Sequence, residues 1–277
     1  MTETTTANPD QAAKWNDRTG RTWAELGDIL DRVLEPFVPL LLNEIEPVAG
    51  RRILDVGCGA GAVTLAAAGR GASALGVDIS APLIEAARER AERSGAAGAE
   101  FAQADAQAHD FQAGRFEALV SRFGVMFFAD PAEAFRNLRS AVRPGGRLAF
   151  VAWRSPAENG FMTAAERSVE GVLQLPERVE GAPGQFGFAD SGRVSAILAQ
   201  SGWTGVEIRP VDVECRMTRD ELRLYARRMG PVADLLPALD EARRTDVERR
   251  IDAGFKPYLS DGKAQFTAAC WKVTASA

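Results

Sequence analysis

Residues 52–61 read RILDVGCGAG, an apolar run that ends in a glycine-rich turn, and residues 74–80 read ALGVDIS, a second apolar run followed by an acidic residue. Glycines in such a turn, here Gly57, Gly59 and Gly61, let the backbone come close to a ligand. A helix that begins there offers free N–H groups and the positive end of its dipole. The two runs therefore predict a strand, a turn and a helix that bind a nucleotide-containing ligand.

Short apolar runs alternate with helical patterns over the stretch from residue 53 to residue 153. The runs are ILDVG, ALGVD, AEFAQ, FEALVS and RLAFVAW, and helices are expected near residues 61–70, 81–94 and 132–142. Strands that alternate with helices form right-handed βαβ units and a parallel sheet. We therefore expect an α/β core.

The segments on either side of this core do not show its alternation of short apolar runs and helical patterns. Residues 1–13 are a polar tail, and residues 22–46 have the apolar spacing of helices. Residues 154–189 are rich in proline and glycine, which indicates an inserted lid. The late runs WTGVEIRPVDVEC and AQFTAACWKVTA alternate like strands and flank a charged helical stretch, so they predict an antiparallel pair.

These patterns divide the chain into four parts. We expect N-terminal lid helices over 1–48, a nucleotide-binding core over 49–153, a lid insertion over 154–189, and the end of the core sheet over 190–277. A helical insertion at 218–254 is expected to contribute to the pocket of a second ligand, because ligands of such sheets bind at the carboxyl ends of the strands.

Composition excludes several classes of function. The 277 residues are 46% hydrophobic and 26% charged, as in an ordinary globular protein. A net charge of -5 argues against a nucleic-acid partner. The N-terminus is polar and no apolar run approaches ~18 residues, so we expect no membrane span and a cytoplasmic location. The three cysteines are far apart and no ligand pattern asks for a metal, so none is expected.

Two kinds of nucleotide ligand fit the glycine turn. Gly57, Gly59 and Ala62 match a GxGxxA dinucleotide fingerprint, with Asp78 about 20 residues further on. Asp55 distinguishes between these two kinds of ligand, because from the tip of the strand its carboxylate is expected to face the turn. It would repel a diphosphate and attract an ammonium-bearing ligand such as S-adenosylmethionine (SAM).

Five motifs, DVGCGAG, GVDIS, ADA, SRFGVMFF and RPGGRLAFVAW, occur in this order and spacing. In them the chain resembles the class I SAM-dependent methyltransferases, particularly the small-molecule branch similar to ubiquinone and menaquinone methyltransferases. The resemblance covers roughly residues 50–153 and, more loosely, the late strands. It implies a Rossmann-like, doubly wound sheet of seven strands, mostly parallel with an antiparallel last strand, plus helical lid insertions.

The resemblance also implies which residues bind the cofactor. Asp55 and the backbone of Gly57, Cys58 and Gly59 would surround the methionyl part of SAM, and Asp78 would bind its ribose hydroxyls. The remaining implied contacts lie on later motifs: Ile79, Asp105 and Ala106 against the adenine, Ser121 and Arg122 near the reactive methyl group, and Phe123 and Met126 as walls of the cleft.

Four of these residues also fit purely structural roles. Asp78 could cap the following helix, although Ser80 is the better N-cap by position. Asp105 could be a turn residue, and Cys58 fits a small turn residue better than a reactive thiol. Arg122 fits a structural ion pair as well as a substrate contact.

Methyl transfer from a sulfonium requires mainly alignment, and a general base only for some acceptors. No catalytic residue is assigned, and His109 and Arg122 are the candidates; the motif register places His109 on the adenine side or in a surface loop. Other groups that could act as bases are Tyr225, Tyr258, Glu158 and Glu166. Arg227 and Arg228 could bind a carboxylate, but fit a solvated helix face better.

The sequence thus predicts a methyltransferase that acts on a small, aromatic or apolar acceptor, with SAM as cofactor and S-adenosylhomocysteine as product. Trp15, Trp153 and Arg122 are the expected acceptor contacts. An NAD(P)-linked oxidoreductase and a SAM-binding protein without methyltransferase activity remain the alternatives. The acceptor atom and the oligomeric state are not determined by the sequence.

Overall fold

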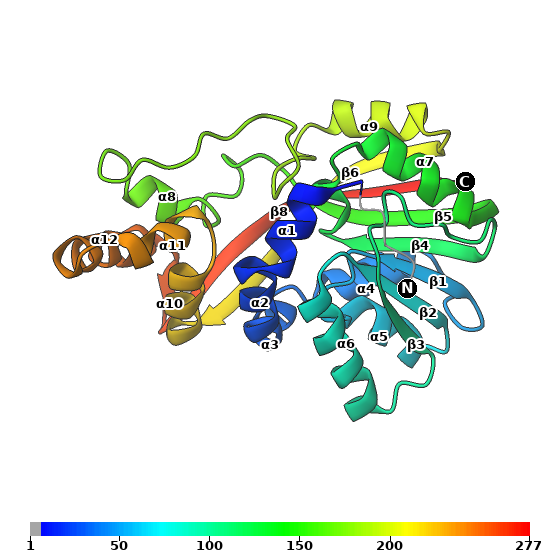
Figure 1. Ribbon diagram of the computed structural model, residues 1–277, viewed down its shortest axis with the longest axis horizontal. Coiled ribbons are helices and arrows are strands. Elements are labelled where there is room, and N and C mark those ends of the chain that lie inside the picture. Colours follow the sequence, from blue (N-terminus) through cyan, green and yellow to red (C-terminus); the bar gives the residue numbers. More distant parts are fainter. Residues whose placement is uncertain (1–6) are drawn as a thin grey trace.

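The computed structural model describes residues 7–277, and over this range eight strands form one sheet (Figure 1). The strand order is β3-β2-β1-β4-β5-β8-β6, and the short β7 pairs with β8. Strands β1 to β5 are parallel, whereas β8 is antiparallel to both β5 and β6. The bounds are β1 Arg52–Val56, β2 Ser73–Asp78, β3 Ala99–Gln103, β4 Phe116–Arg122, β5 Val142–Trp153, β6 Thr204–Thr218, β7 Leu259–Ser260 and β8 Lys263–Ser276.

This arrangement confirms the predicted fold, a mostly parallel sheet of seven main strands whose last strand is antiparallel. Strand β5 begins five residues before the expected run, because Val142 already pairs with Phe116 across a register shift. The last four residues of β1 are buried. Such a strand is covered on both faces, which is the reason for its continuous apolar run.

Helices cover both faces of the sheet (Figure 1). One face carries α4 Phe37–Glu44, α5 Ala62–Gly69 and α6 Ala81–Ser94, and the other carries α7 Pro131–Ala141 and α9 Ser191–Gln200. Asp130 and Asp190 accept backbone N–H groups at the starts of α7 and α9. Such caps satisfy donors that the first turn of a helix leaves unpaired.

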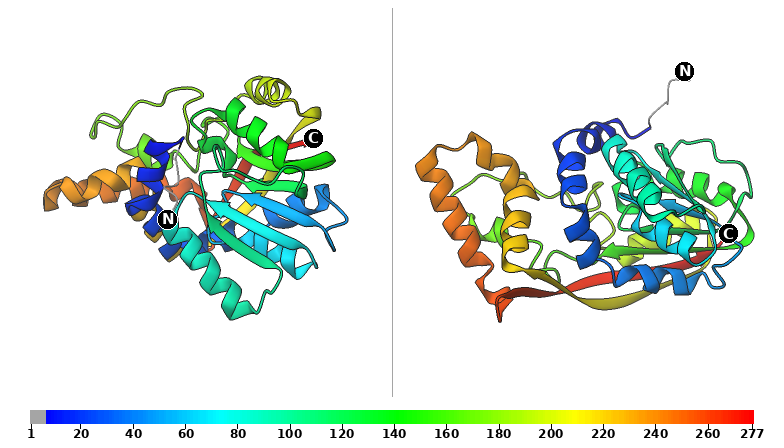
Figure 2. Two further views of the ribbon diagram at one scale, coloured as in Figure 1. Left: turned by 45° about the vertical axis from the view of Figure 1, so that its right-hand side comes forward. Right: turned by 90° about the horizontal axis from the view of Figure 1, so that it is seen from below.

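Strands β6 and β8 run on past the rest of the sheet and hold a second group of helices at their far ends (Figure 2). This group contains α8 Ala164–Ser168, α10 Arg219–Arg228, α11 Pro231–Leu235, the 3₁₀ turn Leu236–Ala238, α12 Glu241–Gly254 and the 3₁₀ turn Lys256–Tyr258. Thr218 and Glu221 form a capping box that begins α10 where β6 ends. The expected insertion at 218–254 is therefore helical.

The N-terminal helices α1 Pro9–Asn16, α2 Arg18–Glu25 and α3 Gly27–Val33 lie between the core and these far helices (Figures 1 and 2). The prediction of a tail over 1–13 was wrong for residues 9–13, which are helical, and residues 1–6 lie outside the described range. The core holds this segment, because the backbone N–H groups of Ala7 and Asn8 donate to Asp105. A tertiary contact of this kind leaves no local signal in a polar sequence.

Candidate functional site

A cavity of about 900 Å³ opens beyond the carboxyl ends of β1, β2, β3 and β4. The strand order reverses between β1 and β4, and ligands of open α/β sheets bind at this point. Its walls come from the turns after these strands, from α1 and α2, from the segment 176–189, and from α10 with the turn that follows it. The cavity therefore joins the core to both groups of flanking helices.

The glycine turn packs backbone against backbone. Gly57 has a φ of +66°, and a Cβ atom there would lie 2.6 Å from the Cα atom of Gly124 in the turn after β4. Ser121 stabilises this contact, because its hydroxyl donates to the Val56 carbonyl at 2.7 Å and accepts from the Gly124 N–H at 3.1 Å. Ser121 is fully buried and lies outside the cavity lining, so the structure does not bring this predicted residue to the ligand space.

Asp55 lies at the floor of the cavity and is only 1% exposed. Its Oδ2 atom accepts a hydrogen bond from the Thr64 hydroxyl at 2.7 Å, whereas the buried Oδ1 atom has no partner among the described residues. Burial raises the pKa of Asp55 to about 6, and the Thr64 bond and the positive charge of Arg122 oppose this shift. A buried carboxylate oxygen without a donor is unfavourable, so this site favours a ligand that brings one.

Asp78 joins the glycine turn to the turn after β2. One carboxylate oxygen accepts from the Gly59 N–H and the other from the Ser80 N–H, both at 2.9 Å. Burial raises the pKa of Asp78, and these N–H bonds oppose the shift. Ser80 does not cap α6 with its side chain, because its hydroxyl donates to the carbonyl of Trp15.

Asn16 supplies the missing cap of α6 from the N-terminal helices. Its side-chain oxygen accepts from the Ala81 N–H at 2.8 Å, and its amide nitrogen donates to the Ile79 carbonyl at 2.9 Å. The same segment reaches the turn after β3, where the carboxylate of Asp105 accepts from Ala7 and Asn8. Ile79, Asp105 and Ala106 all line the cavity. The N-terminal helices thus form a lid that is hydrogen-bonded to two turns of the core.

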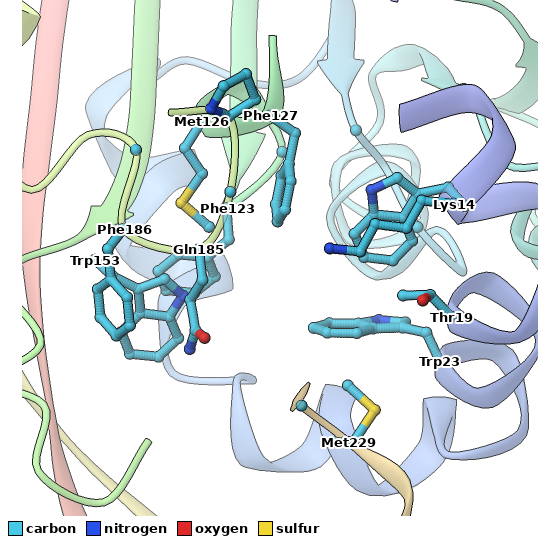
Figure 3. A pocket seen from close by; sticks show the side chains of 18 of the residues that line it. Lys14, Thr19, Trp23, Phe123, Met126, Phe127, Trp153, Gln185, Phe186 and Met229 are labelled. Carbon is cyan, nitrogen blue, oxygen red and sulfur yellow. The ribbon is translucent and has the colours of Figure 1, made fainter. Parts of the chain in front are cut away.

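Arg122 makes an ion pair with Asp31 of α3 and donates to the Leu34 carbonyl at 3.4 Å. It also lines the cavity, so the structural role foreseen for it is present and a ligand contact is still open to it. Phe123 has a φ of +63°, which is costly for a bulky residue. This conformation stacks its ring on Trp153 at 4.3 Å, and both rings face the cavity (Figure 3).

The structure keeps most of the candidate bases away from the cavity or occupied. His109 lies outside the lining and packs edge to face on Phe111. The Tyr225 hydroxyl donates to the Met162 sulfur, and burial raises the pKa of Tyr225 to about 12. The other candidate bases have partners: Glu158 with Ser155 and Arg154, Glu166 with Arg178, and Tyr258 with Arg167. The two arginines considered for carboxylate binding form ion pairs, Arg227 with Glu248 and Arg228 with Glu25.

Cys58 lines the cavity but is only 6% exposed. Burial, and then the negative charges of Asp78 and Asp55, raise the pKa of its thiol well above the usual range. The thiolate is the reactive form of cysteine, so this residue is inert at neutral pH. Within residues 7–277 no group of three or more His, Cys, Asp or Glu side chains could hold a metal ion, and no helix is long and apolar enough to cross a membrane.

Sequence reasoning missed the lining residues of the lid and of the later loops. Trp15 lines the cavity as expected, and further lining residues of the lid follow at helical spacing: Asn8, Gln11, Lys14, Thr19, Thr22 and Trp23. Thr19 and Trp23 lie four residues apart in α2, a spacing that places them on one face of that helix. Gln185 and Met229 had no such signal, because they lie in irregular segments.

The sequence is similar to a family of known proteins. Residues 54–150 match a family model described as a methyltransferase domain. An uncharacterized protein of Mycobacterium tuberculosis is 31% identical over 203 residues, which are 72% of this chain and 70% of that protein. Aklanonic acid methyltransferase of a Streptomyces species is 33% identical over 141 residues, 49% of this chain and 61% of that enzyme. The chain spans 61% of the length of the first mycobacterial relatives that it matches.

A solved structure shares the fold at low sequence identity. A putative methyltransferase from Bacillus halodurans superposes with a TM-score of 0.59 and 17% identity, covering 86% of this chain and 97% of that one. At this identity the likeness concerns the fold alone.

Proposed function

Because the chain belongs to the family of class I SAM-dependent methyltransferase domains, we propose that it transfers a methyl group from SAM to a small-molecule acceptor. Relatives named as methyltransferases of small molecules, such as aklanonic acid methyltransferase, support this proposal. The proposal concerns the activity of this chain, and it rests on the residues of the cavity described above.

The observation that supports SAM most strongly is the buried Oδ1 atom of Asp55, a residue that lines the cavity, which has no hydrogen-bond partner within residues 7–277. The methionyl ammonium of SAM would donate to this oxygen and compensate the buried negative charge. The pyrophosphate of NAD would instead bring negative charge to the same carboxylate. The residues present therefore fit SAM, and they do not fit a dinucleotide.

The other proposed contacts follow from the turns that line the cavity. The backbone of Gly57, Cys58 and Gly59 would hold the methionyl part, and Asp78 would accept the ribose hydroxyls in addition to its two N–H bonds. Around the adenine and the methyl group we propose Ile79, Asp105 and Ala106, and the walls Phe123 and Met126.

When bound, SAM supplies a methyl group on a positively charged sulfur. The chain's own contribution is alignment and exclusion of water, which can supply ~7 to 11 kcal/mol of the barrier when the reacting atoms are held near ~3 to 3.5 Å. The stacked rings of Phe123 and Trp153 and the lid helices enclose the space in which the acceptor would approach.

Calorimetric titration with SAM, S-adenosylhomocysteine and NAD tests the proposal directly. We expect micromolar binding of the two adenosyl sulfur compounds and no heat with NAD. Asp55→Asn should weaken SAM binding, whereas Asp110→Asn, which changes an exposed carboxylate outside the cavity, should not. Binding of NAD without SAM would overturn the proposal, and SAM binding without methyl transfer to any acceptor would favour a SAM-binding protein that does not methylate.

A further inference from the structure

The half of the cavity beyond the glycine turn has flat aromatic walls. Figure 3 shows an open space with Trp23 and Met229 on one side and Trp153, Phe186 and Gln185 on the other. Trp23 is half-buried and packs edge to face on Trp15, with ring centroids 5.8 Å apart. Trp153 is fixed by its stack on Phe123. Flat rings on opposite sides of a space favour a planar, mainly apolar ligand.

The charges around this space are almost all paired. The cations that line the cavity include four arginines with carboxylate partners: Arg18 with Asp234, Arg122 with Asp31, Arg178 with Glu166, and Arg228 with Glu25. Over residues 7–277, Lys14 is the lining cation without a carboxylate partner. Its side chain extends into the open space near Trp23 and Thr19 (Figure 3).

The lining carboxylates do not compensate Lys14. Glu166 and Asp234 are occupied by arginines, and neither Glu177 nor Glu180, both exposed, forms an ion pair with Lys14 within residues 7–277. Lys14 is exposed, so water solvates its ammonium group in the ligand-free chain. An anion on a ligand in the cavity would form a charge-assisted hydrogen bond with it. Lys14 and Trp15 of α1 and Arg18 of α2 all line the cavity, which makes Lys14 part of the lid that closes over the acceptor space.

We propose that the acceptor is a planar, mainly apolar molecule with one anionic group, and that Lys14 binds this group while Trp23 covers the flat face. The inference rests on the proposed function, because it concerns the acceptor half of the same cavity. It assigns to the lid helices α1 and α2 the choice between an anionic acceptor and its neutral counterpart.

Two fluorescent probes that differ in one group test this inference. 1-Anilinonaphthalene-8-sulfonate carries the anion, and N-phenyl-1-naphthylamine lacks it. Binding of each is measured to the full chain with S-adenosylhomocysteine at saturation. Lys14→Gln should weaken binding of the sulfonate about threefold to fivefold, the range of an exposed ion pair, and leave the neutral probe unchanged. Lys263→Gln, an exposed lysine outside the cavity, is the matched control. Trp23→Ala should weaken both probes, with the melting temperature as a check of folding.

Equal effects of Lys14→Gln on both probes, or no effect on the sulfonate, would overturn the inference. The titration with S-adenosylhomocysteine is done first, so failure of the proposed function is seen separately. If that compound does not bind, the same pair of probes is compared on the ligand-free chain, and the ratio of the two affinities still decides the role of Lys14.

Discussion

The two halves of the cavity are built in different ways. The cofactor half is made by short turns between residues 55 and 128, where backbone groups and buried carboxylates set the geometry. The acceptor half is made by side chains from α1, α2, the segment 176–189 and α10, which are far apart in the sequence. A site of the first kind tolerates few changes, whereas a site of the second kind can change its ligand by exchange of single side chains.

Of the substitutions in the cofactor half, Gly57→Ala should destabilise the chain most. The φ of +66° and the 2.6 Å approach to the Gly124 Cα atom leave no room for a methyl group. We expect a loss of about 3 kcal/mol or more in the free energy of unfolding, measured by urea denaturation. Gly59→Ala is the control, because its φ is +55° but nothing lies within 4 Å of the added atom, so it should cost only about 1 kcal/mol. Similar losses for both variants would contradict the proposed backbone contact.

Asp78→Ala should reduce SAM affinity by about 2 to 3 kcal/mol, or roughly 30-fold to 150-fold, because charge-assisted hydrogen bonds are lost. Calorimetry measures the affinity and thermal melting measures the stability. Asp240→Ala removes a carboxylate that caps α12 far from the cofactor half, and should lower the melting temperature without changing affinity. If Asp78→Ala behaved like Asp240→Ala, the ribose role would be wrong.

The raised pKa of Asp55 should make the stability of the ligand-free chain depend on pH. Its pKa in the folded chain is about 6 against an ordinary value of 3.8, so the folded state binds the proton more tightly than the unfolded state. Stability of the ligand-free chain should therefore decrease as the pH rises from about 4 to about 6, and level off above. Asp55→Asn should remove this dependence and stabilise the ligand-free chain at pH 8 by up to about 3 kcal/mol.

The affinity of the chain for SAM should change with pH in the opposite direction to its stability. SAM binding to the native sequence should weaken below about pH 6, where the carboxylate takes up a proton. Asp55→Asn should bind SAM more weakly at pH 8 and show no such titration. A flat affinity profile in the native sequence would exclude Asp55 as the partner of the ammonium group.

Asn16→Ala tests the lid, with the smallest expected effect. The variant loses one bond to Ile79 and the cap of α6, so stability should fall by about 1 kcal/mol. S-adenosylhomocysteine should dissociate faster, by a factor of about 3 to 10, in stopped-flow fluorescence. Asn43→Ala changes an exposed asparagine away from the cavity and serves as control. An unchanged dissociation rate would mean that the lid does not retain the ligand.

The parts of the fold predicted from sequence are those with a local signal. The alternation of apolar runs and helices gave the sheet, and the segment AQFTAACWKVTA was recognised as the antiparallel strand β8. The helix Pro9–Asn16 was assigned in part to the polar tail over 1–13, because its stability comes from contacts with Asp105, Ile79 and Ala81 rather than from its own polar residues. Ser121 was expected at the cofactor, but its hydroxyl bonds to the Val56 carbonyl instead.

The sequence by itself determined the strand, turn and helix order, the glycine turn and the positions of Asp55 and Asp78, because strand alternation, glycine conformations and strand-end carboxylates are local properties. Only the tertiary structure decided that Asp55 is buried with one oxygen unpartnered among the residues it describes, that Asn16 caps α6, and that Lys14 and Trp23 face Trp153. These features depend on burial and on contacts between residues far apart in the chain, and no local pattern encodes such contacts.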